Sequence, residues 1–353
     1  MEKLQAKLVL EDGTIFKGVS FGADMSAAGE VVFNTGMIGY PESLTDPSYY
    51  GQILVLTYPL IGNYGIPEND FSVNSENFES DRIQVTGLVV SEESMKYSHW
   101  QAVQSLSDWL KSAKVPAISG IDTRRLTRIL REKGSMLGKI LIDQDIEFYD
   151  PNHENIVQRV SPAEVTTLGK GTKRVALLDC GCKLSIIRHL LRRNVEVLRL
   201  PWDTDISQHD FDGLLISNGP GNPKECLQPI ESARYAISND IPTFGICLGN
   251  QIIALAAGAD TYKLKYGHRG QNQPVMEQGT KRCIITSQNH GFAVNDDTIP
   301  AGWSPWFRNL NDGTNEGIIH ESGRFMSVQF HPEAAPGPED ADFIFDKFID
   351  MLK

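Results

Sequence analysis

The chain has 353 residues, 41% of them hydrophobic, and a formal net charge of −12. This length allows about two domains with cores of their own, and the composition excludes wholesale disorder. The negative charge argues against nucleic acid or an anionic membrane surface as the main partner. No apolar stretch approaches the roughly 20 residues that span a bilayer.

The first part of the chain, residues 1–150, predicts a β-rich α+β domain. Alternating apolar residues on either side of Asp12-Gly13 predict a hairpin. Further β-rich runs, separated by Gly, Asn and Pro, lie at residues 29–40 and 52–65.

Two helices are expected later in this domain. The first covers residues 98–114, where helical periodicity places four apolar side chains on one face: Trp100, Val103, Leu106 and Leu110. The second follows the segment GIDTRR and ends at Gly134. After it, residues 151–172 are polar and lack sustained periodicity, which predicts a linker between two domains.

The second part, residues 173–353, alternates strands and helices. Continuous apolar strands separated by helices are typical of a mostly parallel sheet that is covered by helices, so we expect an α/β fold here. The expected strands are residues 174–179, 195–200, 211–217, 242–246, 281–287 and 324–330. The expected helices are residues 183–194, 229–239 and 339–352, with another that begins at Cys247.

Cys247 lies at the junction of a buried strand and a helix, between Gly245 and Gly249. The pattern G-x-C-x-G is typical of a tight turn that presents a nucleophile, because glycines relieve the crowding around it. The start of a helix also supplies N–H groups and a positive dipole end, which stabilise a thiolate and an oxyanion. The alternative is a buried structural cysteine between packing glycines.

His331 and Glu333 lie two residues apart at the end of a strand. This spacing places both side chains on one face, where a carboxylate can orient an imidazole and stabilise its charged form. Alternatively, His331 caps the strand and Glu333 is a solvated charge. His290 competes for the role of base, but it lacks an acid at a spacing that a strand allows.

Two glycine-containing turns complete the candidate site. After the strand 211–217 the chain turns through Gly219 and Gly221, which let the backbone approach a substrate and direct N–H groups at it. The segment SQNHGFAV contributes Asn289, Gly291 and Phe292. Either segment alone is also compatible with an ordinary turn.

Taken in order, the segments SNGPGNP, FGICLGNQ, QNHGFAV and FHPEA resemble the class I (triad-type) glutamine amidotransferase domain, which has a flavodoxin-like fold. The segments GHRGQNQPV and FHPEAAPGP, together with GIDTRRLTRILREKG in the first domain, resemble the small-subunit family of carbamoyl phosphate synthetase. The resemblance covers essentially the whole chain. Because the chain stops after the amidotransferase domain, we expect a separate subunit.

The resemblance implies a role for each matching residue. Cys247 would be the nucleophile, His331 the general base and acid, and Glu333 its orienting carboxylate, while the N–H groups of Leu248 and Gly221 would form the oxyanion hole. The residues that would hold L-glutamine are Ser48, Gly219, Gly221, Leu248, Gln251, Asn289, Gly291 and Phe292. Ser48 would be contributed by the first domain. Lys183 fits the family pattern but receives no role.

The family's chemistry implies a partner. Glutamine would be hydrolysed through a glutamyl thioester, and ammonia would pass to a large subunit that makes carbamoyl phosphate from bicarbonate. This chain has no phosphate-binding loop, so no cofactor is expected on it, and ATP and its divalent metal would bind the large subunit.

Other functions stay open at this point. The chain could serve another amidotransferase, for anthranilate, GMP or CTP synthesis, although that leaves its first domain unexplained. It could be a catalytically silent regulatory subunit, or a thiol hydrolase that acts alone.

The number and spacing of the cysteines and the character of the N-terminal residues predict the cellular compartment. The five cysteines are odd in number and follow no regular spacing, and no zinc-type cluster of cysteine and histidine accompanies them, so we expect free thiols and no metal site. The N-terminus lacks the apolar core of a signal peptide and carries acids, unlike a transit peptide. A reducing cytoplasm is therefore predicted.

Overall fold

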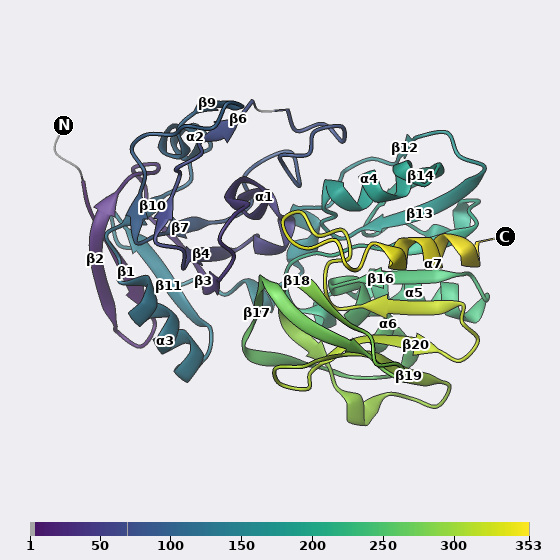
Figure 1. Cartoon of the computed structure of the whole chain (residues 1–353). Helices are drawn as coiled ribbons and strands as arrows, with labels where there is room; N and C mark the ends of the chain where they lie inside the picture. The colour runs from purple at the N-terminus through teal and green to yellow at the C-terminus, as the bar shows by residue number, and fades with distance from the viewer. Residues whose placement is uncertain (1–3, 69, 353) are drawn as a thin grey trace. The chain divides into compact units, whose positions relative to one another are not determined.

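The computed structural model describes residues 4–68 and 70–352, which form two compact units (Figure 1). The first unit is Met1–Asn152 and the second is His153–Lys353. Each unit has its own hydrophobic core.

The first unit is built on a closed β-barrel. In pairing order its strands are β1 (Gln5–Leu10), β11 (Met136–Leu141), β3 (Ala27–Asn34), β4 (Gln52–Leu56), β7 (Gly87–Val89), β10 (Ala117–Ser119) and β2 (Ile15–Ser20). Closure pairs each of these strands on both sides, so the barrel has no open edge. The predicted hairpin is confirmed, because β1 and β2 pair antiparallel and Gly13 turns between them with a φ of 84°.

Short helices and strands complete the first unit. The helices are α1 (Tyr40–Thr45), α2 (Leu106–Ser112), α3 (Thr123–Lys133) and the 3-10 helix η1 (Pro47–Tyr49). Two small sheets pair β5 (Leu60–Ile61) with β8 (Glu92–Glu93), and β6 (Ile66–Pro67) with β9 (Ala102–Gln104). Trp109 of α2 packs against Phe78 in the core, with ring centroids 5.6 Å apart.

The helix predicted for residues 98–114 is wrong over its first half. Its helical part begins only at Leu106, because the side chain of Ser105 caps the helix by accepting a hydrogen bond from the N–H of Asp108. Before Leu106 the chain forms the strand β9 where the first turns of the helix were expected. Trp100 and Val103 are 84% and 60% exposed. The cap outweighs the apolar periodicity that suggested a longer helix.

The second unit contains a ten-stranded sheet among the described residues. In order its strands are β12 (Thr166–Leu168), β14 (Val195–Pro201), β13 (Lys173–Asp179), β15 (Gly213–Ile216), β16 (Thr243–Ile246), β21 (Phe325–Val328), β20 (Asn315–His320), β19 (Trp303–Asn309), β17 (Thr261–Glu277) and β18 (Cys283–Val294). From β14 to β21 neighbouring strands run parallel, which confirms the predicted parallel core. Beyond β21 the pairs are antiparallel, an extension that the strand–helix alternation did not predict.

Helices cover both faces of the parallel core, as predicted (Figure 1). They are α4 (Leu184–Arg192), α5 (Leu227–Ser238), α6 (Leu248–Ala257) and α7 (Phe343–Met351). Residues of α5 and α6 share one hydrophobic cluster with Ala176 and Leu178 of β13. Phe244 of β16 instead packs against α7, with ring centroids 5.5 Å from Phe348, and α7 in turn stacks on α4.

The segment predicted as a linker contains ordered structure. Within residues 151–172, the 3-10 helix η3 (Ile156–Arg159) places Val157 in the core of the second unit. The strand β12 pairs antiparallel with β14. The second unit begins at His153, so most of this segment belongs to it.

Candidate active site

Cys247 occupies the turn between β16 and α6, with φ 55° and ψ −101°. L-residues rarely adopt this conformation, and such strain persists only where the surrounding structure enforces it. Here the N–H of Cys247 donates to the carbonyl of Val328 at 2.8 Å, which anchors the turn to β21. The predicted tight turn at Cys247 is confirmed as backbone geometry, and the Cys247 side chain itself is buried.

Backbone crowding explains why both neighbours of this turn are glycines. A Cβ at Gly245 would lie 2.5 Å from the carbonyl oxygen of Gly249, and a Cβ at Gly249 would lie 2.1 Å from that of Ile216. Real Cβ atoms do not approach backbone oxygens so closely. The pattern G-x-C-x-G therefore lets α6 begin directly against the ends of β15 and β16.

His331 and Glu333 follow β21 and form a short hydrogen bond. The Nδ1 atom of His331 lies 2.6 Å from Oε1 of Glu333, and both side chains are buried. Cys247 is among the groups that raise the pKa of this imidazole, which places the thiol near the ring, although Nε2 makes no hydrogen bond to any described residue. A thiol, an imidazole and a carboxylate thus lie in one neighbourhood, and these are the groups that proton transfer from a thiol requires.

Lys183 adds a cation that sequence analysis left without a role. Its Nζ lies 3.0 Å from Oε1 of Glu333 and donates to the carbonyl of Ala334 at 2.5 Å. Burial by itself raises the pKa of Glu333, but the charges of Lys183 and His331 outweigh burial and lower this pKa to about 2. The carboxylate is therefore ionised at neutral pH.

The environment of His331 favours its protonated form. Burial lowers the pKa of the imidazole and Lys183 also lowers it, but the charge of Glu333, the hydrogen bond to Glu333 and the influence of the nearby Cys247 outweigh both, so the pKa is raised. A ring with a raised pKa can take the proton of a neighbouring thiol. We call Cys247, His331, Glu333 and Lys183 the thiol cluster.

The turn that holds Gly219 and Gly221 lies beside the start of α6. A Cβ at Gly219 would lie 2.1 Å from the carbonyl oxygen of Cys180 and 2.8 Å from a methyl group of Leu248, so only glycine fits there. Gly221 has a φ of 89°. Leu248 is the first residue of α6, so its N–H has no carbonyl four residues earlier within the helix to bind. These positions suit an oxyanion hole, which stays a prediction.

Gln251, Asn289 and Phe292 lie around the thiol cluster. The amide nitrogen of Gln251 donates to the carbonyl of Phe292 at 2.9 Å and to Gln329 Oε1 at 3.1 Å. The thiol of Cys247 donates to the carbonyl of Asn289 at 3.6 Å. In this arrangement Gln251 fixes the segment that carries Asn289, Gly291 and Phe292. Binding of glutamine by these residues stays a prediction.

Ser48 belongs to the first unit. It lies in η1, is buried, and its N–H donates to Oδ1 of Asp46 at 2.9 Å. Its predicted contact with glutamine stays a prediction.

His290, the second candidate for the base, is turned to a different set of partners. Its Nδ1 lies 2.8 Å from the carbonyl of Phe292 and its Nε2 lies 3.2 Å from Gln288 Oε1. Burial and the nearby charge of His268 lower the pKa of His290 well below its ordinary value. Its contacts favour His331 over His290 as the group that meets the thiol.

Comparison with known proteins gives two family matches. Residues 8–140 match the family model for the carbamoyl-phosphate synthase small chain, CPSase domain, and residues 176–351 match glutamine amidotransferase class-I. No helix in the described part of the chain is long and apolar enough to cross a membrane.

Curated relatives are similar over nearly the whole chain. The chain is 49% identical over 365 residues to the carbamoyl phosphate synthase arginine-specific small chain of Saccharomyces cerevisiae, which covers 99% of this chain and 89% of the relative. It is 51% identical over 356 residues to the mitochondrial "carbamoyl-phosphate synthase [ammonia]" of Mus musculus. It is 52% identical over 357 residues to the multifunctional protein CAD of Squalus acanthias. These matches cover 99% of this chain but only 24% and 16% of the two longer relatives.

Proposed function

Because the chain belongs to the family of carbamoyl-phosphate synthase small chains, we propose that it hydrolyses L-glutamine and supplies ammonia for carbamoyl phosphate synthesis. The observation that carries this proposal is the buried His331–Glu333 hydrogen bond together with the strained backbone turn at Cys247. A thiol, a base and an orienting carboxylate in this order are the groups that acyl transfer from an amide requires.

In the first step the chain cleaves the amide. His331 takes the proton of Cys247, and the thiolate forms a bond to the γ-carbonyl carbon of glutamine. The N–H groups of Leu248 and Gly221 stabilise the oxyanion of the tetrahedral intermediate. His331 then gives its proton to the departing nitrogen, so the C–N bond breaks, ammonia leaves and a γ-glutamyl thioester remains on Cys247.

In the second step water releases the product. His331 takes a proton from a water molecule whose oxygen attacks the thioester carbon. The C–S bond breaks, glutamate leaves, and the proton returns to the sulfur through His331. Throughout both steps the ionised Glu333 holds Nδ1–H of His331 and stabilises the imidazolium. Lys183 keeps that carboxylate ionised in a buried position.

The ammonia has to be used by a partner. Neutral water would protonate most of it and remove its nucleophilic lone pair, so we place the consuming chemistry in a large subunit that binds ATP with its divalent metal and activates bicarbonate. This chain would bind neither of them.

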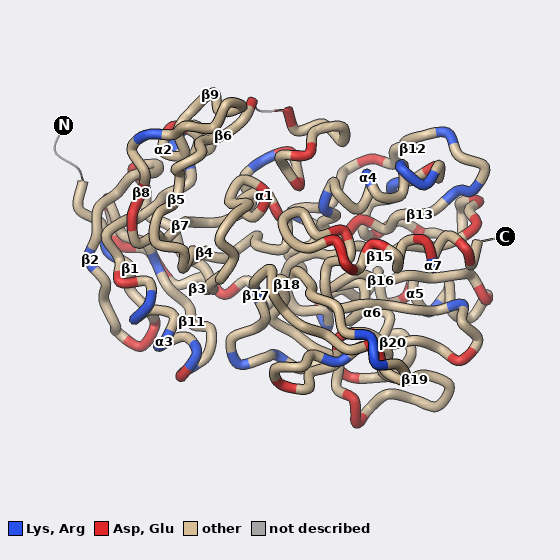
Figure 2. Tube along the Cα trace, viewed as in Figure 1, with Lys and Arg blue, Asp and Glu red and all other residues tan. Residues whose placement is uncertain are grey.

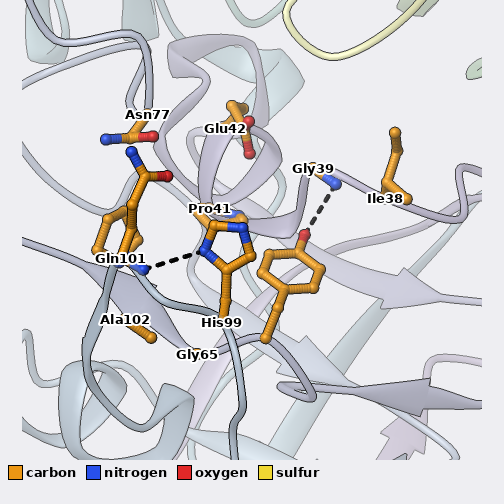
Figure 3. Close-up of a pocket in the computed structure, with 11 residues that line it drawn as sticks. Ile38, Gly39, Pro41, Glu42, Gly65, Asn77, His99, Gln101 and Ala102 are labelled. Atoms are coloured by element: carbon orange, nitrogen blue, oxygen red, sulfur yellow. Dashed lines mark hydrogen bonds between the residues drawn. The ribbon is translucent and has the colours of Figure 1, made fainter.

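The first unit carries a surface that suits such a partner. A pocket of about 340 Å³ opens in it, lined by residues that include Gly39, Tyr64, His99 and Gln101 (Figure 3). Large apolar side chains are exposed in the same unit, among them Ile38 on the pocket and Trp100 next to Gln101 in the chain. Exposed apolar side chains of this size are typical of interaction surfaces.

The rival functions each leave an observation unexplained. A glutaminase for anthranilate, GMP or CTP synthesis does not account for the family match of residues 8–140. A silent regulatory subunit does not account for the strained backbone at Cys247 beside the buried His331–Glu333 pair.

The charge distribution and the cysteines support a reducing compartment and a small-molecule substrate. Acidic and basic positions are interspersed along the trace of both units (Figure 2). Of the five free cysteines, four are buried and Cys283 is exposed. We propose the cytoplasm, which cell fractionation followed by detection of the chain tests.

A direct test measures glutamate release. Purified chain, alone and with its copurified large subunit, is mixed with labelled glutamine, and labelled glutamate is quantified. We expect turnover that disappears when Cys247 is replaced by alanine. Turnover that is equal in the wild type and in Cys247→Ala would refute the proposal.

A further inference from the structure

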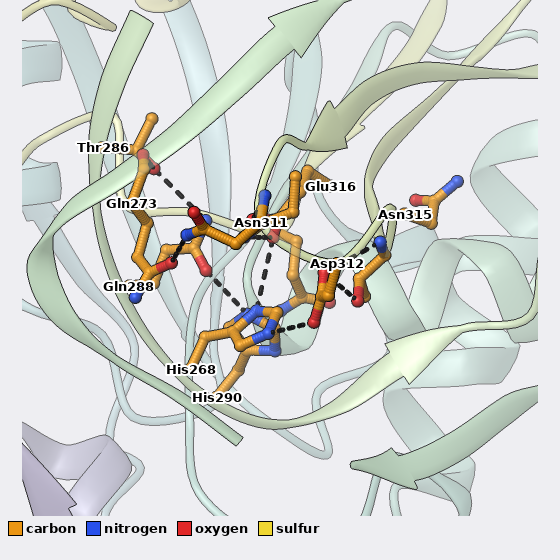
Figure 4. A network of polar contacts seen from close by, with 12 residues as sticks. His268, Gln273, Thr286, Gln288, His290, Asn311, Asp312, Asn315 and Glu316 are labelled. Carbon is orange, nitrogen blue, oxygen red and sulfur yellow. Dashed lines mark hydrogen bonds and ion pairs between the residues drawn. The ribbon is translucent and has the colours of Figure 1, made fainter. Parts of the chain in front are cut away.

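A second buried polar cluster lies in the antiparallel part of the second unit (Figure 4). It consists of His268 on β17, Gln288 and His290 on β18, and Glu316 on β20. We call these four residues the hairpin cluster. His268 and His290 face each other across the β17–β18 pair, with ring centroids 4.9 Å apart, and Glu316 is fully buried. The mechanism above uses none of them.

In the neutral His290 ring, the nitrogen without a proton faces a hydrogen-bond acceptor, which it cannot bond. Its Nδ1 lies 2.8 Å from the carbonyl of Phe292, which only accepts, so Nδ1 carries the proton of the neutral ring. The other nitrogen, Nε2, therefore presents a lone pair. It lies 3.2 Å from Oε1 of Gln288, which is also an acceptor.

The orientation of the Gln288 amide is set by its other neighbour. The hydroxyl of Thr286 donates to the carbonyl of Gln273 at 2.9 Å, so it can only accept from Gln288. Accordingly, Nε2 of Gln288 lies 3.2 Å from that hydroxyl and donates to it. Turning the amide over would place two acceptors together at Thr286. The lone pairs of His290 and Gln288 thus face each other in a buried place.

Two more atoms of the cluster lack hydrogen bonds of good geometry. Among the described residues, these buried atoms are Nδ1 of His268 and Oε2 of Glu316, although His268 and Gln288 both interact with the Glu316 carboxyl and lower its pKa against the effect of burial. Nδ1 of His268 lies 3.4 Å from Oε1 of Glu316. Buried polar atoms are almost always paired, so several at one point indicate a further polar partner, either an ion or ordered water.

The remaining atoms of these side chains are held as metal ligands usually are. Nε2 of His268 lies 2.8 Å from Oδ2 of Asp312, Nδ1 of His290 is bonded to a backbone carbonyl, and Oε1 of Glu316 accepts from Asn309 at 2.9 Å. A carboxylate or carbonyl on the far nitrogen of each histidine fixes the ring and directs the other nitrogen at the metal.

The spacing fits a small divalent ion. Ligand atoms of His268, His290 and Glu316 all lie within 4.8 Å of one another. Neighbouring ligands on tetrahedral Zn²⁺ are about 3.3 Å apart when the bonds are about 2.0–2.1 Å. The separation of 3.2 Å between Nε2 of His290 and Oε1 of Gln288 agrees with that value. Oε1 of Glu316, on the same carboxylate as the ligand atom Oε2, lies 3.4 Å from Nδ1 of His268.

From this geometry we infer that His268, Gln288, His290 and Glu316 bind a divalent transition metal such as Zn²⁺. Two imidazole nitrogens and two oxygens suit zinc better than Mg²⁺ or Ca²⁺, which prefer oxygen alone. The ion would tie β17, β18 and β20 together. Through the carbonyl of Phe292, which binds both His290 and Gln251, it would also order the segment of Asn289.

The test is a zinc titration of the full chain. Metal is stripped with a chelator, and Zn²⁺ alone is added in competition with a chromogenic chelator. Cys247→Ala serves as the background, so that the thiol cluster cannot bind the ion. We expect one Zn²⁺ per chain and a rise in melting temperature on binding.

Variants identify the ligands. His268→Gln keeps a donor for Asp312 but removes the ligand nitrogen, and Glu316→Gln removes the carboxylate; both should abolish stoichiometric binding. Asp312→Asn should weaken binding by about 10–100-fold, because it only supports His268. His320→Asn is the matched control, since His320 bonds Ser322 away from the cluster, and it should change nothing.

Two outcomes overturn the proposal. One is a wild-type titration without a stoichiometric site, and the other is a site that survives in both His268→Gln and Glu316→Gln. If those variants fail to fold, Co²⁺ added to the Cys247→Ala protein decides: tetrahedral Co²⁺ absorbs visible light, and lack of this absorption overturns the proposal. NMR signals showing His290 protonated on both nitrogens in metal-treated protein also overturn it. Glutamine hydrolysis enters none of these readouts.

Discussion

The second unit holds two buried clusters that each contain a histidine–carboxylate pair but differ in the third group beside the histidine. In the thiol cluster, His331 has a carboxylate on Nδ1 and a thiol on its other side, and Lys183 balances the charge. In the hairpin cluster, His268 has a carboxylate on Nε2, and its other nitrogen faces Glu316 and no thiol. A histidine–carboxylate pair alone does not specify chemistry, because the third group decides its role.

The difference also follows from backbone position. The thiol cluster stands at the ends of parallel strands, where β16 turns into α6 and β21 ends, and where chain turns can approach a small molecule. The hairpin cluster lies inside antiparallel strands, whose side chains are fixed by neighbours on each side. The first arrangement suits turnover and the second suits a static ligand.

The largest expected effect is that of Cys247→Ser. Glutamine-dependent synthesis by the complex with the large subunit should fall by more than about 10⁶-fold, because a nucleophile is lost. Synthesis from added ammonia should remain, since it bypasses the thiol. Steady-state assays with each nitrogen donor measure both. Loss of the two activities together would mean that Cys247 is structural.

Next come the two partners of the thiol. His331→Ala should reduce glutaminase turnover by roughly 10⁶-fold and Glu333→Ala by roughly 10⁴-fold, because orientation contributes less than proton transfer. The kcat of glutamate release from the purified complex gives the ranking. A larger loss for Glu333→Ala would reverse the roles assigned to the two side chains.

Removing Lys183 should affect stability strongly. Lys183→Met leaves Glu333 buried without its cation, and breaking a buried ion pair in this way costs about 3–5 kcal/mol. Lys224→Met, which breaks the exposed pair with Asp260, is the matched control and should cost less than about 1 kcal/mol. Urea unfolding measures both, and equal effects would show that the thiol cluster gains nothing from Lys183.

The thiol cluster also predicts how the free energy of unfolding decreases at acidic pH. The pKa of Glu333 is lowered in the folded state, so Glu333 stabilises the fold above its unfolded pKa, and this stabilisation is lost as pH falls toward about 2. Glu333→Gln should flatten the loss of unfolding free energy between about pH 5 and pH 2. Glu321→Gln, at an exposed position, should leave the slope unchanged. If the unfolding free energy of Glu333→Gln decreased with pH as steeply as that of the wild type, the lowered pKa of Glu333 would be contradicted.

The smallest expected effect on catalysis is that of His268→Gln. The hairpin cluster makes no proton transfer, a contribution worth about 10²–10⁴-fold, so glutaminase kcat should fall by about tenfold at most. A loss as large as that of His331→Ala would make the hairpin cluster part of the chemistry. Initial rates at saturating glutamine measure this.

The sequence predicted the parallel core and the tight turn at Cys247 better than the rest. Strands such as β13 and β16 are short continuous apolar runs, and Cys247 lies between two glycines that only a tight turn explains. By contrast, β17 carries many polar residues and two register shifts, so no simple alternation marks it as a strand.

Contacts between distant residues could not be predicted from local patterns. Lys183 meets Glu333 across 150 positions, and no motif joins them. The side chains of the hairpin cluster come from three strands, whereas the common zinc-binding sequence motifs consist of closely spaced cysteines and histidines. Trp100 also fitted a helical stripe that the Ser105 cap excludes.

The central claim is that the sulfur of Cys247 becomes covalently acylated by glutamine. Acid-quenched mixtures of the complex with the large subunit and labelled glutamine, digested and analysed by mass spectrometry, measure this directly. We predict a labelled γ-glutamyl group on the peptide that contains Cys247, formed as ammonia is released. Glutamate production without any label on that peptide, even in a rapid-quench series, would contradict the account.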